Sequence, residues 1–213
     1  MTGGVFAIET LHDWSLWCQK ALNGELVVLD VRDDQAYRKG HVPAAYGFPW
    51  SPDFPQQLSR ALRGSRPPLG IFGDRDTAAE AQKALAGLGL SPQCVWDAGL
   101  HDWIDQGLPV VGEVTAHDLY RQREQFVVLD IREPYEHRSG VVPGAVLVPM
   151  GQLPHKLPSL SREHHYAVMC RSGNRSLNMS AWLALQGYRV TNVLDGINGW
   201  LAGGYPLVRP EEG

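Results

Sequence analysis

The chain of 213 residues has an ordinary globular composition, 44% hydrophobic and 20% charged, and is long enough for one large domain or two compact ones. A net charge of -4 and a pI near 6.0 argue against a basic surface, so neither nucleic acid nor an anionic membrane is expected as a partner. No apolar run approaches the roughly 18 residues of a membrane helix, and no basic, apolar leader follows Met1.

The cysteines add a prediction about the compartment. They are odd in number and far apart, which suits a reducing environment better than a disulfide framework: Cys18, Cys94 and Cys170. The sequence therefore predicts a cytoplasmic protein. No cysteine lies at a Cys-x2-Cys or Cys/His spacing, so neither a metal nor another cofactor is expected.

The first periodic segment predicts a helix that begins near Thr10 and ends at Asn23-Gly24. Its apolar residues recur at the spacing of one helical face: Leu11, Trp14, Cys18, Ala21 and Leu22. Residues 25–32 then form a near-continuous apolar run, which is typical of a buried parallel strand. Cys18 is expected to pack in a core, as free cysteines commonly do, and not to act as a nucleophile.

The two halves of the chain repeat each other. LVVLDVR at residues 26–32 matches FVVLDIR at residues 126–132, and a Gly-x-Val-Pro segment recurs at residues 40–45 and 140–145. Near the end of each half, residues 95–103 correspond to residues 193–200. The repeat predicts two domains, residues 1–110 and residues 111–213.

Each half alternates helices with short apolar runs. The order is helix, buried strand, short helix, short strand, helix, buried strand, helix and strand, which favours a parallel sheet covered on both faces. The expected fold class is therefore α/β, with two repeated domains, each a parallel β-sheet flanked by helices on both faces. In the second half, strands are expected at residues 127–130, 145–148, 166–169 and 190–194.

One cysteine lies between an expected strand and an expected helix. Cys170 follows the apolar run of residues 166–169 and precedes a helical stretch from Ser176 to Gln186. Ligands of parallel α/β sheets bind at the carboxyl ends of strands, and a helix N-terminus favours an anion. These features and the nearby Arg171 and Arg175 are expected to lower the pKa of the thiol and favour the thiolate.

Four ordered blocks of the second half resemble a rhodanese, that is, a thiosulfate sulfurtransferase, domain. They are Leu129-Asp-Ile-Arg-Glu133 with Glu136, Gly140 to Ala145, Cys170 to Ser176, and Asp195 to Trp200 followed by Gly204-Tyr-Pro206. Because the first half repeats this outline, the chain resembles a compact tandem rhodanese. The resemblance implies that Cys170 accepts a sulfane sulfur as a persulfide and passes it to a thiol or cyanide. It also implies an anion cradle for a donor such as thiosulfate, made by Arg171, Ser172, Gly173, Asn174, Arg175 and Ser176.

The two halves differ at the positions of this resemblance. Val141 of the second half stands where the family usually has histidine. Asp130 and Arg132, also in the second half, are interpreted as a structural ion pair that is exposed or half-exposed. In the first half, an alignment on Gly89 and Gly187 places Phe72 opposite Cys170. Because an aromatic carbon cannot carry sulfur, the first domain is expected to be catalytically silent.

Three classes of function stay open on these residues. The first is a sulfurtransferase. The second is a rhodanese-related phosphatase or arsenate reductase, which the spacing disfavours because Cys170 and Arg175 form Cys-x4-Arg and those enzymes need Cys-x5-Arg. The third is a non-enzymatic sulfur carrier, sensor or partner-binding module. The sulfur acceptor, whether a thiol or a protein, is not identified by the sequence.

Overall fold

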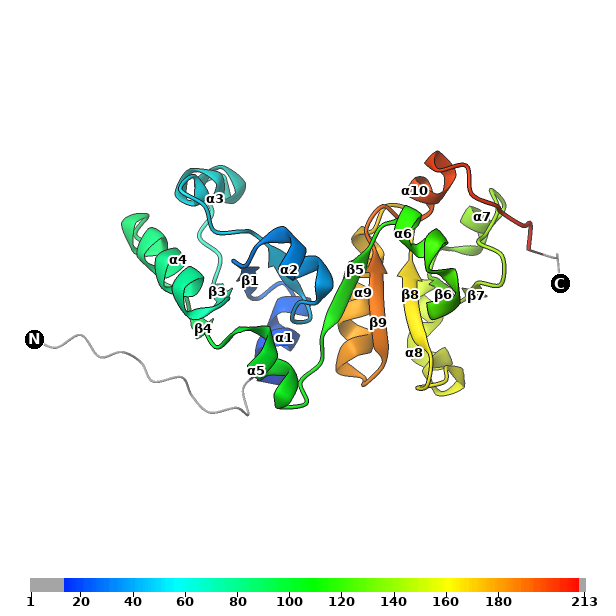
Figure 1. Cartoon of the computed structure of the whole chain (residues 1–213), viewed down its shortest axis with the longest axis horizontal. Helices are drawn as coiled ribbons and strands as arrows, with labels where there is room; N and C mark the ends of the chain where they lie inside the picture. The colour runs from blue at the N-terminus through cyan, green and yellow to red at the C-terminus, as the bar shows by residue number, and fades with distance from the viewer. Residues whose placement is uncertain (1–13, 211–213) are drawn as a thin grey trace, which may run out of the picture. The chain divides into compact units, whose positions relative to one another are not determined.

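A computed structural model describes residues 14–210, whose contacts divide the chain into two compact units (Figure 1). Within the described range, unit 1 contains residues 14–37 and 44–108, and unit 2 contains residues 38–43 and 109–210. Residues 38–43 group with unit 2, in which His41 and Val111 exchange two backbone hydrogen bonds of 2.9 Å. The first residues of the helix expected from Thr10, residues 10–13, lie outside the described residues.

Unit 1 is built on a parallel sheet with the strand order β2-β1-β3-β4. The strands are β1 (Val27–Asp30), β2 (Ala45–Gly47), β3 (Leu69–Phe72) and β4 (Cys94–Trp96). The helices are α1 (Trp14–Leu22), α2 (Asp34–Lys39), which runs into residues 38–43, α3 (Phe54–Leu62), α4 (Arg75–Gly87) and α5 (Gly99–Asp105). Each strand is joined to the next through a helix, which is α2, α3 and α4 in turn, as parallel strands require.

Helices cover both faces of this sheet. Leu29 and Ile71, on the central strands, pack in one cluster with Leu58 of α3 and Leu85 of α4. Alternate strand residues point to opposite faces, so Phe72 lies on the other side. There Phe72 meets the ring of Trp103 in α5 edge-on, with centroids 5.7 Å apart. Trp103 is 1% exposed and is a core residue.

Unit 2 is built on a five-stranded parallel sheet with the order β5-β9-β8-β6-β7 (Figure 1). The strands are β5 (Val111–Val114), β6 (Val127–Asp130), β7 (Val146–Leu147), β8 (His165–Met169) and β9 (Arg189–Val193). The α-helices are α6 (Ala116–Arg121), α7 (Pro134–His137), α8 (Leu153–Lys156), α9 (Asn174–Leu185) and α10 (Gly196–Ala202). Short 3-10 turns occupy Arg123–Gln125, Met150–Gln152 and Leu157–Ser159.

The central strands of unit 2 alternate their side chains between two cores. Leu129 and Val168 pack with Leu183 of α9 in one core. Val128 and Met169 are the strand neighbours of Leu129 and Val168, and they pack in the second core with residues of α6 and α10. Because a strand has a period of two residues, a continuous apolar run fills both faces at once. The strands end together at the edge of the sheet where Cys170 lies.

The expected fold class is confirmed: the chain is α/β, with parallel sheets flanked by helices. The four strands expected in the second half occur within one residue of the expected bounds. Strand β5 is not predicted from the sequence, because Val-Gly-Glu-Val is short and lies at the expected boundary between residues 110 and 111. Within residues 14–210, no helix is long and apolar enough to cross a membrane.

The strand registers correct one expected correspondence. Phe72 pairs with Asp30, and Met169 pairs with Asp130, so Phe72 and Met169 occupy the same place in their sheets. Gly73, and not Phe72, therefore follows the strand where Cys170 does. The alignment failed because it was fixed at the helix end, whereas the connection is shorter in the first half: α4 begins at Arg75, three residues after its strand, and α9 begins five residues after Met169. Glycine, like phenylalanine, carries no nucleophile.

Candidate active site

Residues 170–176, the cysteine loop, connect β8 to α9 at the middle of the sheet. Strand β8 ends at Met169 and lies between β9 and β6, so Cys170 emerges at the carboxyl edge of a central strand. Gly173 is the N-cap residue of α9 and has a φ of 87°, which is left-handed backbone. A left-handed residue turns the chain sharply, and this turn brings the first amides of α9 back toward Cys170.

The N-terminus of α10 donates backbone hydrogen bonds to the cysteine loop. The N–H of Ile197 donates to the carbonyl of Cys170 at 2.9 Å, and the N–H of Asn198 donates to the carbonyl of Arg171 at 3.1 Å. Gly196 permits this approach, because a Cβ there would lie 2.5 Å from the Cys170 carbonyl oxygen. The carbonyls of Cys170 and Arg171 thus accept hydrogen bonds from α10, and the backbone N–H groups of the loop are left to donate hydrogen bonds to the Cys170 sulfur.

The surroundings of Cys170 favour the thiolate. The residue is 1% exposed, and burial by itself raises the pKa of its thiol. Hydrogen bonds from the Ser176 hydroxyl and from the backbone N–H groups of Ser176, Ser172 and Gly173 outweigh burial, so the pKa is lowered overall. The Ser176 oxygen lies 3.4 Å from Cys170 Sγ and 3.1 Å from the Gly173 carbonyl, and its single proton serves one acceptor at a time.

The other two thiols have the opposite character. Burial, together with a smaller contribution from the nearby Cys94, raises the pKa of Cys18 to about 12. Burial also raises the pKa of Cys94 to about 12, against a smaller lowering by Lys20. Both are therefore thiols at neutral pH, whereas Cys170 is poised to ionise. The thiolate is the nucleophilic form, so the structure separates Cys170 from the other two cysteines.

The two arginines of the cysteine loop have different surroundings. Arg171 is exposed, and it makes none of the ion pairs found among residues 14–210. Arg175 instead donates from both terminal nitrogens to the carboxylate of Glu136, each at 2.7 Å. Ser172 and Asn174 are exposed, and Gly173 and Ser176 are buried. The sequence placed Glu136 in a rhodanese-like block but gave no sign of its partner, 39 residues away.

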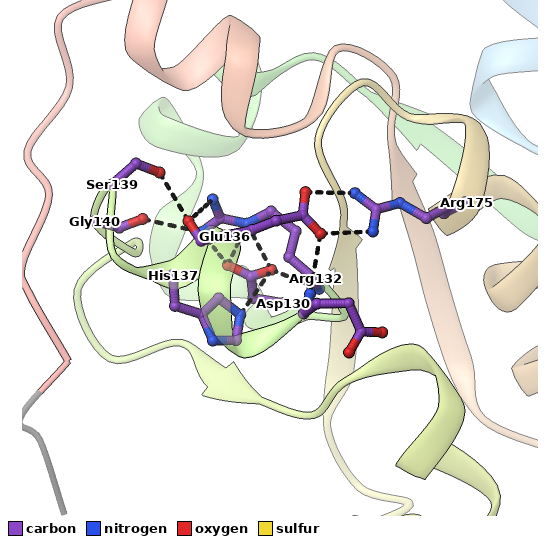
Figure 2. Close-up of polar contacts among 8 residues, drawn as sticks. Asp130, Arg132, Glu136, His137, Ser139, Gly140 and Arg175 are labelled. Atoms are coloured by element: carbon purple, nitrogen blue, oxygen red, sulfur yellow. Dashed lines mark hydrogen bonds and ion pairs between the residues drawn. The ribbon is translucent and has the colours of Figure 1, made fainter.

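Asp130 and Arg132 form a buried ion pair, which corrects the expectation of exposed or half-exposed charges. Asp130 is 0% exposed and Arg132 is 1% exposed. Arg132 donates from Nε and Nη2 to the Asp130 carboxylate, at 2.6 to 3.0 Å. Its guanidinium also donates to the carbonyls of Glu136 at 3.2 Å and Gly140 at 2.9 Å (Figure 2). The pair therefore ties the end of β6 to the segment that carries Glu136, as a structural pair would.

We expect Ser176→Ala to slow alkylation of Cys170 by iodoacetamide by several-fold below neutral pH. The hydroxyl is the first of the groups that lower the pKa of Cys170, so its loss raises the pKa and reduces the thiolate fraction. At a pH above the thiol's pKa in both proteins, the rates should converge. Alkylation rates measured against pH test this.

The matched control is Ser180→Ala, one turn further along α9. Ser180 is also 0% exposed, but its hydroxyl has no hydrogen-bond partner in the described chain. This variant should keep the wild-type alkylation profile. If both variants, or neither, shift the profile, the hydrogen bond from Ser176 does not set the pKa.

A cysteine loop at the carboxyl edge of a parallel sheet, with a thiolate held by helix N-terminal amides, defines a class of α/β proteins that bind an anion or activate a thiol. Residues 115–203 match the family model of the rhodanese-like domain. A sulfurtransferase of Allochromatium vinosum is 35% identical over 106 residues, which cover 48% of this chain and 99% of the relative. The chain belongs to the rhodanese-like family of sulfurtransferases.

A second relative agrees with this membership. The putative sulfurtransferase YtwF of Bacillus subtilis is 38% identical over 77 residues, which cover 36% of this chain and 75% of the relative. Among solved structures, a rhodanese-related protein of Thermoplasma volcanium is 36% identical, with a TM-score of 0.45, and the match covers 46% of this chain and 98% of that one.

Proposed function

We propose that the chain is a sulfurtransferase that carries a sulfane sulfur on Cys170, with thiosulfate or a related anion as the donor. The observation that carries this proposal is the position of Cys170 at the carboxyl end of a central strand, with its sulfur among four hydrogen-bond donors of the cysteine loop that lower its pKa against the effect of burial. A resting thiolate needs no general base, and the cysteine loop itself contains no histidine.

The reaction divides into two displacements at sulfur. In the first, the Cys170 thiolate attacks the outer sulfur of thiosulfate, an S–S bond to Cys170 forms, and sulfite leaves with the electron pair of the broken S–S bond. In the second, a thiolate or cyanide attacks the outer sulfur of the persulfide, and the bond to Cys170 breaks. The Cys170 thiolate is then regenerated, so atoms and charges balance without a cofactor.

The loop chemistry supports both steps in the same way. Thiolate, persulfide anion and departing sulfite each place negative charge near the amides of Ser172, Gly173 and Ser176. Arg171 is exposed, whereas Arg175 is paired with Glu136, so Arg171 is the arginine of the loop that can attract an anionic donor. We further propose that unit 1 does not transfer sulfur, since Gly73 occupies the place of Cys170 in its sheet.

Incubation of the full chain with thiosulfate is expected to add the mass of one sulfur atom, located on Cys170 by peptide mapping. Cyanide should then remove that sulfur and release thiocyanate. Cys170→Ala is the control and should gain no sulfur, whereas Cys94→Ala should gain it normally. A stable gain of sulfur without turnover would make the protein a sulfur carrier, and no gain with any sulfane donor would contradict the proposal.

A further inference from the structure

Glu136 is held in place by three groups besides Arg175. It belongs to the short helix α7, and its backbone carbonyl accepts hydrogen bonds from Arg132 at 3.2 Å and from the Ser139 hydroxyl at 2.8 Å. Its carboxylate accepts from the N–H of Glu133 at 3.1 Å and so caps its own helix. Figure 2 shows the carboxylate directed from this anchored segment toward Arg175. The buried pair of Asp130 and Arg132 thus fixes the backbone from which Glu136 extends.

Arg175 lies where a cation is unfavourable without a partner. It is the second residue of α9, whose N-terminus carries the positive end of the helix dipole, and the first turn of α9 contains no acidic residue. Glu136 supplies the missing negative charge from α7. The two bonds are parallel, each terminal nitrogen of Arg175 facing one carboxylate oxygen, which fixes direction as well as charge.

Arg175 immediately precedes Ser176, whose hydroxyl lies 3.4 Å from Cys170 Sγ, so the pair lies at the same first turn of α9 as the reactive sulfur. The carboxylate of Glu136 is the main cause of the raised pKa of Arg175, and the Cys170 thiolate raises that pKa further. Arg175 therefore interacts with two anions, one structural and one reactive. Its side chain is 32% exposed, so without Glu136 it has solvent into which to turn.

We propose that Glu136 is a positioning residue for sulfur transfer at Cys170: it holds the Arg175 guanidinium beside the sulfur, where that charge stabilises the thiolate. This rests on the proposed function for its effect on turnover. Glu136 does not act on the donor, because both its oxygens are engaged and its side chain is 14% exposed. Hydrogen bonds from Arg175 lower the pKa of Glu136 to about 2, so it stays ionised wherever Cys170 is titrated.

The test is the pH profile of Cys170 alkylation in Glu136→Gln, which keeps the side-chain length and removes the charge. The expected result is a midpoint shifted to higher pH, with alkylation at pH 6 slower by about fivefold or more, the scale of one hydrogen bond to a charged group. Glu136→Asp keeps the charge and shortens the reach, so its midpoint should lie below that of Glu136→Gln. An unchanged or lower midpoint in Glu136→Gln would overturn the proposal.

A double-variant cycle separates positioning from a direct effect. If Glu136 acts through Arg175, then adding Glu136→Gln to Arg175→Gln changes the alkylation midpoint no further. Two shifts that simply add would contradict this. The charge control is Glu133→Gln at the N-cap of α7, which removes a carboxylate that makes none of the described hydrogen bonds to Arg175 and keeps the backbone N–H that donates to Glu136, and it should keep the wild-type midpoint.

The alkylation readout does not depend on sulfur transfer. A shifted midpoint in a protein that forms no persulfide would support the role of Glu136 and refute the proposed function. Persulfide formation with an unshifted midpoint would do the reverse. In a protein that transfers sulfur, Glu136→Gln should lower kcat/KM in parallel with the loss of thiolate at each pH, and the loss should diminish at high pH.

Discussion

Replacing Gly173 by alanine is expected to lower sulfur transfer by about 10²-fold, the scale of an ångström displacement of a reacting group. Gly173 has a φ of 87°, and a non-glycine residue costs about 1–2 kcal/mol in left-handed backbone. The steric effect is larger. A Cβ at this position would lie 2.0 Å from the backbone oxygen of Leu194, at the end of β9, so either the cysteine loop or the start of α10 must move.

Both movements would damage the site. The amides of Ser172, Gly173 and Ser176 reach Cys170 because Gly173 turns the chain, and α10 holds the carbonyls of Cys170 and Arg171. The variant should therefore show a raised pKa of Cys170 together with slow transfer. Kinetics of persulfide formation and the alkylation profile measure the two effects.

The control for backbone strain is Gly204→Ala. Gly204 has a φ of 65°, but a Cβ there would meet nothing within 4 Å. The Gly204→Ala variant should lose only the free energy of holding alanine in left-handed backbone, about 1–2 kcal/mol of stability, and its rate of sulfur transfer should stay within threefold of wild type. Equal losses of transfer in the two variants would show that the close approach to Leu194 is unimportant.

The fold was predictable because its signals are local or repeated. The runs before Cys170 and around Asp130 are continuous and apolar, as strands buried on both faces require, and the repeat gave each element a second example. Strand β5 gave no such signal. Val-Gly-Glu-Val is short and interrupted, and its pairing partner β9 comes almost 80 residues later, so only the tertiary structure identifies it as an edge strand.

The site was predictable in part. A cysteine between a strand and a helix is visible in the sequence, since the strand and helix patterns fix where the loop begins and ends. The pairing of Arg175 with Glu136 is not visible, because it joins residues that no periodicity relates. The same holds for the support that Gly196 and α10 give to the loop. Sequence patterns locate side chains on elements, and contacts between elements decide which charges are already paired.

The buried pair of Asp130 and Arg132 is the clearest case in which burial changes the expected energetics. Exposed ion pairs contribute about 0–1 kcal/mol, whereas removing one partner of a buried pair costs about 3–5 kcal/mol, because the other charge is left without compensation. Arg132→Met is therefore expected to destabilise unit 2 by about 3–5 kcal/mol. It also leaves the Gly140 carbonyl without its guanidinium donor and frees the segment that carries Glu136.

Hydrogen exchange of the amides of β6 and β8, followed by mass spectrometry, measures this loss within unit 2. Arg121→Met is the matched control, because Arg121 is exposed at the end of α6 and the same change should cost less than about 0.5 kcal/mol.

The double variant Asp130→Asn/Arg132→Met removes both charges and should recover part of the stability that Arg132→Met loses. Recovery would show that the loss in the single variant comes from the charge left on Asp130, which then has the His137 imidazole 3.6 Å away as its ion-pair partner, and not from the lost packing of the arginine. If the double variant is no more stable than Arg132→Met, the charge left on Asp130 is not the cause of the loss, and the lost contacts of Arg132, among them its hydrogen bonds to Glu136 and Gly140, are. In either case the alkylation midpoint of Cys170 should rise, because the backbone that presents Glu136 to Arg175 depends on Arg132.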